Sequence, residues 1–454
     1  MPTLSNYKNC VPILFLIILI SCKKIIEVNE PKNQITTEKA FETDQSAIAV
    51  ISNIYAQFNN GSFINDNFTI YLSLYTDELT GLNLSGSALD FYSGSITPEN
   101  INNLNIWKGF YSIIYQVNAV LEGLKSSRSI TSATRRQLEG EAKFLRAFSY
   151  FYLINTYNKV PLLTTTDVLI TSVAPRISSQ EVYEQIIVDL VEAKSLLQFN
   201  YPTNEKVRAN YWSAGALLAR VHLYKSNWIK AEQESSEILD SDVYGPLTEA
   251  LNVFLKNSRE AILQFWTSNG FTSQGTNLNP ISGNPIFYLT PRFITEFDTT
   301  DRRKETWITL VTLGNNSYPL STKYKKNSAT SGSDDEYLMC LRISEQLLIR
   351  AEARAEQNNI VGALEDLNKI RARANTSLIL PPITKDSCIL LIQSERKKEF
   401  FTEWGHRFFD LKRWNKLNEE LSSIKPTWTS KSIHLPVPQN EINKNPNLDQ
   451  NPGY

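Results

Sequence analysis

The sequence predicts a mostly α-helical protein, in which tetratricopeptide-like helix pairs form a curved array around an irregular, loop-rich region. Two observations predict this fold. Apolar residues recur every three to four positions over long stretches, as in amphipathic helices. Two distant segments also share one pattern of small residues, which indicates two copies of a helix–turn–helix unit.

Three long helices are expected in the N-terminal half. Residues 47–58 and 104–124 carry apolar residues at helical spacing, whereas residues 136–157 are apolar on nearly every face. A helix of this last kind is typical of the centre of a protein. We expect it to end before Pro161, because proline cannot continue a helix.

The helix pairs are predicted from small residues at matching intervals. Ala219 and Ala231 lie twelve positions apart, as do Ala351 and Ala363, and a short polar turn separates the members of each pair. Small residues at this spacing allow two antiparallel helices to approach closely, as in tetratricopeptide repeats. Because the two copies are far apart in the sequence, we expect a curved array and not a free solenoid.

Two other segments are expected to be irregular. Residues 265–333 are rich in Gly, Pro, Ser, Thr and Asn, and residues 59–103 have a similar character. Loops on a rigid scaffold commonly form binding surfaces. The last thirty residues, rich in proline, should form an extended tail. We divide the chain into residues 1–21, a helical region at 22–255, and a C-terminal region at 256–454.

The N-terminus has the features of an export signal. An apolar run of ten residues, 11–20, contains Pro12 and is too short to span a bilayer, so residues 1–21 are interpreted as a signal peptide. The run ends Leu19-Ile20-Ser21-Cys22, which resembles the bacterial lipobox. Acylation of Cys22, with chains such as palmitate, would anchor the protein to a membrane. An ordinary exported protein with a chance cysteine is the alternative.

Composition excludes several classes of function. The 46 Lys and Arg residues against 47 Asp and Glu leave a net charge of −1, which gives no reason to expect nucleic acid as a partner. The three His residues lack metal-ligand spacing, and no motif for a cofactor is present. Beyond the signal and the anchor, Cys340 and Cys388 remain; two lone buried thiols are favoured over one disulfide.

No motif for catalysis is present either. A pair of carboxylates that hydrolyses glycosides remains possible on sequence grounds. However, Glu345, Glu352 and similar residues lie on predicted helices beside Arg350 and Arg354, where a solvated face of ion pairs is the usual interpretation. We therefore expect no enzyme activity.

Five segments, in order along the chain, resemble the SusD/RagB family of outer-membrane nutrient-binding lipoproteins. They are the lipidated start at 21–31, GEAKFLRAFSYFYLINTYNKVPL (140–162), RISEQLLIRAEARAE (342–356), ERKKEFFTEWGHRFFDLKRW (395–414) and the closing LPVPQNEINKNPNLDQNPGY (435–454). The charged residues of the fourth segment are expected to form ion pairs that hold its helices to the tail: Arg396, Glu399, Arg407, Asp410 and Arg413. The cluster Asp298, Asp301, Arg302 and Arg303 likewise resembles a structural motif of the family.

The resemblance implies a function in nutrient uptake. Members of this family sit as lids on a SusC-like TonB-dependent transporter in the outer membrane. They bind oligosaccharides or other nutrients at the cell exterior and do no chemistry on them. The resemblance thus implies carbohydrate binding for polysaccharide utilization, with a SusC-like transporter, a nutrient ligand and the outer membrane as partners. A lid for a non-sugar nutrient such as peptide, a lipid-anchored glycosidase and a pure helical scaffold are the competing interpretations.

The residues that contact ligand are predicted from chemistry, because the family holds them in no fixed motif. Sugar rings present apolar CH faces that stack on aromatic side chains, and their hydroxyls need polar partners at the rim. We predict an aromatic platform of Tyr92, Trp266 and Tyr288, with Asp90 or Asn284 at its rim. The alternative for each aromatic is a place in the core; for Trp107 and Trp212, inside periodic helices, we assign that place.

Overall fold

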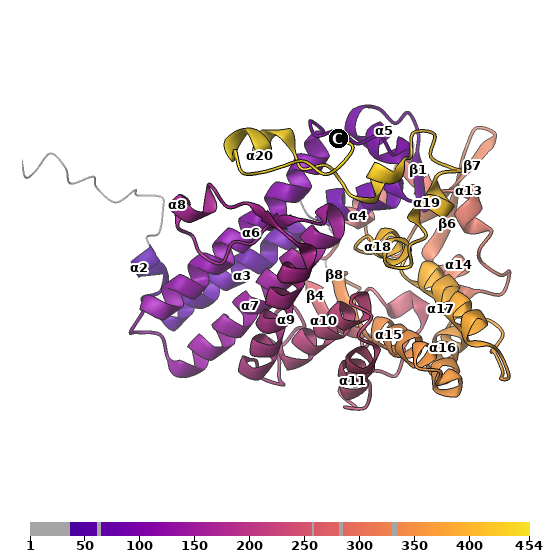
Figure 1. The fold of residues 1–454 in the computed structure, drawn as a ribbon. Helices are drawn as coiled ribbons and strands as arrows, with labels where there is room; N and C mark the ends of the chain where they lie inside the picture. Colours follow the sequence, from indigo (N-terminus) through magenta and orange to yellow (C-terminus); the bar gives the residue numbers. More distant parts are fainter. Residues whose placement is uncertain (1–36, 61–64, 257, 281–284, 329–333) are drawn as a thin grey trace, which may run out of the picture.

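The computed structural model describes residues 37–60, 65–256, 258–280, 285–328 and 334–454, and helices dominate it (Figure 1). The helices up to residue 239 are α2 (Thr37–Ala40), α3 (Asp44–Asn60), α4 (Asn65–Tyr75), α5 (Gly86–Ser93), α6 (Ile101–Ser126), α7 (Ser132–Tyr157), α8 (Val168–Thr171), α9 (Ser179–Leu196), α10 (Tyr211–Tyr224) and α11 (Trp228–Leu239). Those that follow are η2 (Ala250–Asn252), α12 (Ser273–Leu278), α13 (Pro291–Ile294), α14 (Arg302–Trp307), α15 (Ile343–Glu356), α16 (Ile360–Arg373), α17 (Lys385–Glu399), α18 (His406–Arg413), α19 (Leu417–Leu421), η3 (Ser430–Ile433) and α20 (Gln439–Lys444).

The three long N-terminal helices form as predicted. Helix α7 packs against α3, α6 and α9, and it buries side chains on all sides, which places it in the centre. Each helix begins where a polar side chain satisfies free backbone N–H groups: Asn100 accepts from Asn102 N and Asn103 N, and Thr131 accepts from Thr134 N. Helix α7 ends at Tyr157, before Pro161.

Both predicted helix pairs are present, and they lie side by side. Helices α10 and α11 form one pair and α15 and α16 the other, with α11 packed on α15. Ala219 and Ala231 are fully buried in one cluster with Ile349 and Ala353 of the second pair. The small side chains thus allow close approach within a pair and also between the two pairs.

The strands are short and form two-stranded antiparallel sheets within the described residues. They are β1 (Leu79–Gly81) with β5 (Phe287–Leu289), β2 (Val160–Pro161) with β3 (Arg176–Ile177), β4 (Ala261–Phe265) with β8 (Leu338–Arg342), and β6 (Ile308–Leu313) with β7 (Asn316–Ser321). The pair β4–β8 joins the two ends of the segment predicted to be irregular at residues 265–333. The pair β1–β5 joins that segment to the other one, at residues 59–103.

The prediction that residues 59–103 are irregular is largely wrong. Helices α4 and α5 and strand β1 occupy most of the described part. Phe68, Leu72 and Tyr75 recur at helical spacing, and all three are fully buried in the core. The many Asn, Ser and Gly residues obscured this pattern; Gly94, in the left-handed conformation, ends α5.

The expected solvated ion pairs on α15 are in fact buried. Helix α15 is packed against α10, α11, α16 and α17, so it has no solvent-exposed face. Glu345 pairs with Arg220 at 2.6 Å, and Glu352 pairs with Arg413 at 2.5 Å; all four side chains are at most 8% exposed. These pairs bind separate helices together.

The charged residues of α17 and α18 also form buried pairs, but not with the tail as expected. Asp410 pairs with Arg396 and Arg413, which holds α17 to α18, and Arg407 pairs with Asp77 beyond α4. A larger network balances five cations against five anions: Arg303, Arg342, Arg371, Arg373 and Lys323 with Asp301, Glu260, Glu395, Glu399 and Glu403. It joins α14, β8, α16 and α17, so the predicted structural role of Asp301 and Arg303 is confirmed.

The tail is held by hydrogen bonds that follow its path back over the N-terminal helices. The Asn451 side chain donates to the carbonyl oxygens of Tyr157 and Leu435, and the Asn103 side chain donates to that of Pro436. Cys340 and Cys388 are free and buried, as predicted. In the part of the chain that the structure describes, no helix is sufficiently long and apolar to cross a membrane.

Candidate functional site

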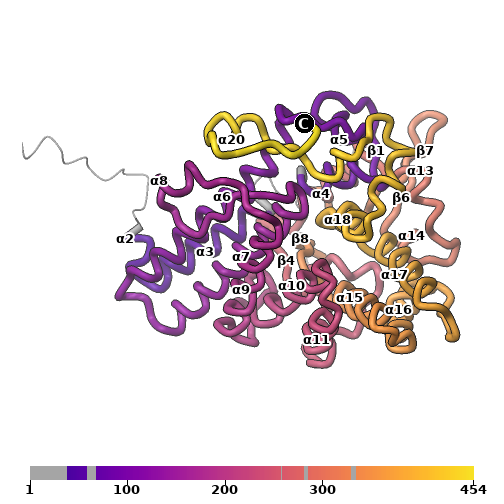
Figure 2. Tube along the Cα trace, viewed as in Figure 1, coloured from indigo at the N-terminus to yellow at the C-terminus, as the bar shows by residue number. Residues whose placement is uncertain are grey.

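The two segments singled out as binding regions meet at one end of the molecule. Strand β1 pairs with β5 in the register Thr80 to Tyr288, and β5 lies against β7. Figure 2 shows α5, β1 and the β6–β7 hairpin gathered at this end. The surface here is therefore built from residues more than two hundred positions apart.

Three tyrosines, Tyr92, Tyr288 and Tyr318, form an aromatic group on this surface, called here the tyrosine cluster. The rings of Tyr288 and Tyr318 meet edge to face, with centroids 5.0 Å apart. Partial burial raises the pKa of Tyr288, and the neighbouring hydroxyls of Tyr318 and Tyr92 raise it further. All three side chains are partly exposed. The structure thus brings the predicted Tyr92 and Tyr288 together.

A buried lysine contacts the ring of Tyr92 in the cluster. The Lys425 Nζ lies 4.4 Å from the centre of the Tyr92 ring and donates to the Leu74 carbonyl oxygen at 2.6 Å. Burial lowers the pKa of Lys425 to about 7. A cation beneath an aromatic ring is attracted to its π face. Lys425 therefore holds Tyr92 in place, and the Tyr92 side chain stays partly exposed.

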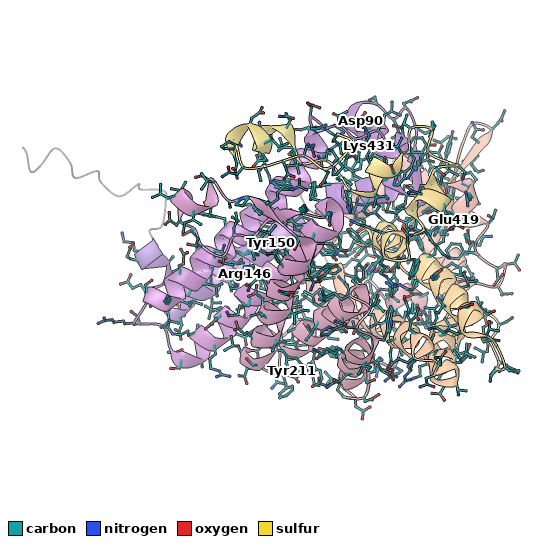
Figure 3. The ribbon with its side chains drawn as sticks, in the orientation of Figure 1. Asp90, Arg146, Tyr150, Tyr211, Glu419 and Lys431 are labelled. Atoms are coloured by element: carbon teal, nitrogen blue, oxygen red, sulfur yellow. The ribbon has the colours of Figure 1, made fainter. Side chains whose placement is uncertain are left out.

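The two predicted rim residues, Asp90 and Asn284, are not equally well placed by the structure. Asp90 lies on α5 (Figure 3), and its carboxylate accepts a hydrogen bond of 2.9 Å from the side chain of Asn100, the residue that caps α6. Asp90 therefore joins α5 to α6 and is two residues from Tyr92. Asn284 lies outside the described residues, as does Cys22.

Trp266 occupies a different place from the two predicted tyrosines. It directly follows β4, is 40% exposed and lies beside Tyr337, whose hydroxyl donates to Glu205 at 3.0 Å. Trp107 and Trp212, in contrast, are buried as predicted. Trp266 is thus an exposed ring directly after the buried residue Phe265, which ends β4.

Two members of this site were missed from the sequence. Tyr318 lies on β7, which runs from exposed at Asn316 to buried at Ser321 inside a segment interpreted as loop. Lys425 lies in the connection after α19, where a lone lysine would normally face solvent. Its burial depends on contacts with Leu74 and Tyr92, which the sequence around Lys425 does not predict.

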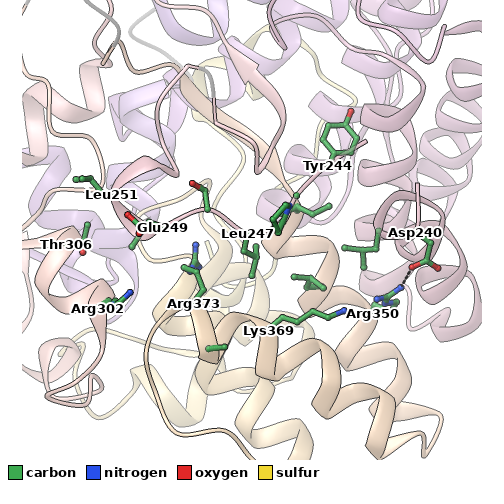
Figure 4. Close-up of a pocket in the computed structure, with 18 residues that line it drawn as sticks. Asp240, Tyr244, Leu247, Glu249, Leu251, Arg302, Thr306, Arg350, Lys369 and Arg373 are labelled. Carbon is green, nitrogen blue, oxygen red and sulfur yellow. Dashed lines mark hydrogen bonds and ion pairs between the residues drawn. The ribbon is translucent and has the colours of Figure 1, made fainter. Parts of the chain in front are cut away.

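A well-formed hollow lies elsewhere in the described structure. It has a volume of about 780 Å³ and lies between the loop 240–251 and helices α14, α15 and α16 (Figure 4). Leu247 and Leu347 give it an aliphatic wall, and Arg302 and Lys369 supply cations. Its only ring, Tyr244, is 7% exposed. The hollow therefore lacks the flat aromatic faces that a sugar needs, and we favour the tyrosine cluster for that ligand.

Two carboxyl groups, those of Glu78 and Glu336, have raised pKa values. Burial raises the pKa of Glu78 to about 7, and burial also raises that of Glu336 to about 7. Both side chains are at most 2% exposed. Glu336 is held in place by the backbone N–H groups of Lys325 and Lys326. These shifts arise from burial inside the fold, where a substrate has no access.

Comparisons with known proteins agree across most of the chain. A family profile described as "Starch-binding associating with outer membrane" matches residues 25–223, and the profile of the "SusD family" matches residues 266–432. "SusD-like protein P38" of Formosa agariphila is 24% identical over 99% of this chain and 100% of its own length. "Starch-binding protein SusD" of Bacteroides thetaiotaomicron is 32% identical over 26% of this chain and 22% of its own length.

Solved structures have the same fold. A SusD superfamily protein from Bacteroides vulgatus superposes with a TM-score of 0.78 at 19% identity, over 90% of this chain and 99% of its own. A "Laminarin binding SusD-like protein" does so with a TM-score of 0.76 at 22% identity, over 90% of this chain and 99% of its own. Since the two profiles lie in chain order and the fold agrees over nearly the whole length, this chain belongs to the SusD/RagB family.

Proposed function

We propose that this protein is a glycan-binding lipoprotein at the cell surface, which delivers its ligand to a SusC-like TonB-dependent transporter and does no chemistry on it. The observation that carries the proposal is the tyrosine cluster, where the two loop-bearing segments meet. Relatives named for binding starch and laminarin support the sugar class of ligand.

The cluster has the chemistry that sugar recognition requires. An edge-to-face pair of rings presents surfaces at two inclinations, so a bent oligosaccharide can stack one residue on each ring. The Tyr288 hydroxyl remains able to donate at neutral pH, because burial and the neighbouring tyrosines hold the pKa of Tyr288 above its usual value. Asp90, two residues from Tyr92, supplies an acceptor at the rim.

The membrane location rests on the N-terminal sequence. Residues 1–21 are proposed to be removed as a signal peptide, with Cys22 acylated as the new first residue. The resulting anchor would place the lid on the outer membrane beside its transporter. The absence of catalysis is supported by the burial of Glu78 and Glu336, the two carboxyl groups whose pKa values are raised to about 7.

The first experiment is a binding screen. Protein that begins after Cys22 is tested against plant, host and microbial polysaccharides, with calorimetry on each hit and product analysis alongside. We expect saturable binding with the ligand recovered intact. Released product would overturn the non-catalytic proposal, and the failure of every polysaccharide would overturn the sugar proposal.

Variants then locate the site. Replacing Tyr288 and Tyr318 together with Ala removes two stacking faces, and we expect the affinity for the identified glycan to fall by about tenfold or more, or ~1.4 kcal/mol. Tyr115→Ala is the matched control, because Tyr115 is 59% exposed on α6 and far from β5 in the chain. Unchanged affinity in the double variant would contradict the site. Trp266→Ala tests separately whether Trp266 extends the platform.

A peptide ligand is the second candidate, and one observation favours it. The hollow of Figure 4 combines the aliphatic Leu247 and Leu347 with the exposed cation of Arg302, which suits an aliphatic side chain next to a carboxylate. If peptides bind and glycans do not, Arg302→Ala should weaken peptide binding while the tyrosine variants leave it unchanged.

A further inference from the structure

Four aliphatic side chains are exposed together on α8 and the turn after it. Val168, Leu169, Ile170 and Val173 are 67%, 80%, 56% and 47% exposed, and no residue of α8 is buried. Scattered apolar residues are normal on a protein surface, but a contiguous group marks a contact surface. This group is called here the α8 tip.

The α8 tip is held firmly in its exposed position. The Glu122 carboxylate of α6 accepts hydrogen bonds from the Thr165 hydroxyl at 2.8 Å, from the Thr166 N–H at 2.9 Å and from the Thr166 hydroxyl. The Asp167 carboxylate accepts from Leu169 N and caps α8. After the tip, the side chains of Asn445 and Asn447 donate to the carbonyl oxygens of residues 174 and 173. Directed polar contacts on both sides therefore keep these apolar groups in solvent.

The tip lies at the end of the molecule where the described chain begins. Phe41, just after α2, packs against Gly123, and the Ser127 hydroxyl donates to the Phe41 carbonyl oxygen at 2.8 Å. Gly123 adjoins Glu122, the residue that holds the loop before α8. Figure 1 shows α2 and α8 at the same extremity. Fourteen residues separate Cys22 from Thr37, so they can reach at most roughly 50 Å.

The size and surroundings of the tip favour a lipid surface over a protein partner. A stable protein interface takes about 20–30 residues from each side, many more than the four side chains here. Apolar side chains that insert into a bilayer interface bind in proportion to the apolar area they bury, and cations beside them are attracted to anionic lipids. Lys125 and Arg135 line a hollow of about 460 Å³ that also touches Thr164, immediately before the tip's loop. Lys143 of the same hollow is paired with Glu139 and Glu192.

We propose that the α8 tip inserts into the bilayer that carries the lipid anchor and forms a second membrane contact for this protein. The inference rests on the proposed anchoring at Cys22. An anchor alone fixes position but not orientation, whereas an anchor and an inserted tip together restrict how the body stands on the membrane. The tyrosine cluster lies at the opposite end of the molecule from α8 and would be held away from the lipid (Figure 2).

The test measures the polarity around the tip. Leu169→Cys in the full chain is labelled with an environment-sensitive dye; Cys340 and Cys388 are at most 4% exposed and resist labelling. The acylated protein is reconstituted in vesicles of phosphatidylethanolamine and phosphatidylglycerol. We expect a blue-shifted emission and about twofold quenching by lipids brominated in the acyl chains. Ile229→Cys on α11, 72% exposed, is the control and should be unaffected.

A second arrangement separates this proposal from the anchoring. The same labelled chain, with Cys22 replaced by a hexahistidine tag, is bound to nickel-chelating lipid, which places the same end at the bilayer without acylation. Quenching at position 169 here supports insertion even if mass spectrometry finds no acyl group on Cys22. If the protein floats with the vesicles but the dye emits as it does in water, insertion is overturned. A blue shift that occurs only when a transporter is added would also overturn it.

Discussion

Glu399 should be among the most sensitive positions in this protein. Its Oε1 lies 2.5 Å from Arg342 Nη1 and 2.5 Å from Arg373 Nη2, and its Oε2 lies 3.0 Å from Arg303 Nη1. Burial by itself would raise the pKa of Glu399, but the guanidinium groups of Arg373, Arg342 and Arg303 outweigh burial and hold it well below its usual value. The carboxylate is therefore charged in the fold.

Replacing Glu399 with Gln keeps its size and removes its charge. The network would then hold five cations against four anions. Removing one partner of a buried pair costs about 3–5 kcal/mol, and we expect ~4 kcal/mol here. Since domains are commonly stable by only 5–15 kcal/mol, this is a large fraction of the total.

The assay is urea unfolding at pH 7, followed by far-UV circular dichroism and by tryptophan fluorescence. Glu356→Gln is the matched control, because Glu356 pairs with Lys385 at 2.7 Å but both side chains are partly exposed, at 24% and 34%. An exposed pair contributes at most about 1 kcal/mol. If the two variants lose the same small amount of stability, the reasoning about the buried network is refuted.

Two further predictions concern single residues. Because burial raises the pKa of Glu78 from 4.5 to about 7, the wild-type protein should lose stability as the pH rises from about 5 to 8, by up to ~3 kcal/mol. Glu78→Gln should lessen this dependence in unfolding titrations between pH 5 and 8 and leave the share of Glu336, whose pKa is raised likewise; parallel curves would contradict it. Gly405→Ala should lower the melting temperature, because φ is +69° and the new Cβ would lie 2.5 Å from Leu72 Cδ1. Gly314→Ala shares the positive φ, at +61°, without a close neighbour, and an equal loss there would show that the contact with Leu72 contributes nothing.

The parts of the fold that were predictable are those with a strong local pattern. Residues 136–157 are apolar on most faces, so their central position follows from the sequence, and the spacing of Ala219 and Ala231 predicts their helix pair. Helix α4 was missed because its apolar residues are interleaved with Asn, Ser and Thr, and its burial is decided by distant helices. Glu345 was misplaced for the same reason, since its partner Arg220 is 125 residues away.

The candidate site was only half predictable. Aromatic residues in two loop-rich segments pointed to Tyr92 and Tyr288, but the contact between those segments depends on the pairing of β1 with β5, which is long-range. Lys425 could not be found, because a buried lysine depends on partners from elsewhere in the chain. The roles of Tyr92, Tyr288, Trp266, Asp90 and Asn284 in binding stay predictions, as do the acylation of Cys22 and the division at residue 255.

The strand pair β4–β8 has a consequence for how such proteins diversify. It brings Phe265 opposite Leu338, so the seventy-two residues between them leave the helical scaffold and return to it at one place. The helices before and after this segment contact each other directly, because α11 packs on α15. The intervening segment itself contributes Phe293 and Trp307 to the hydrophobic core, so only its exposed turns can be exchanged or lengthened without opening that core. A lineage could in this way acquire a new ligand specificity while it keeps the same body.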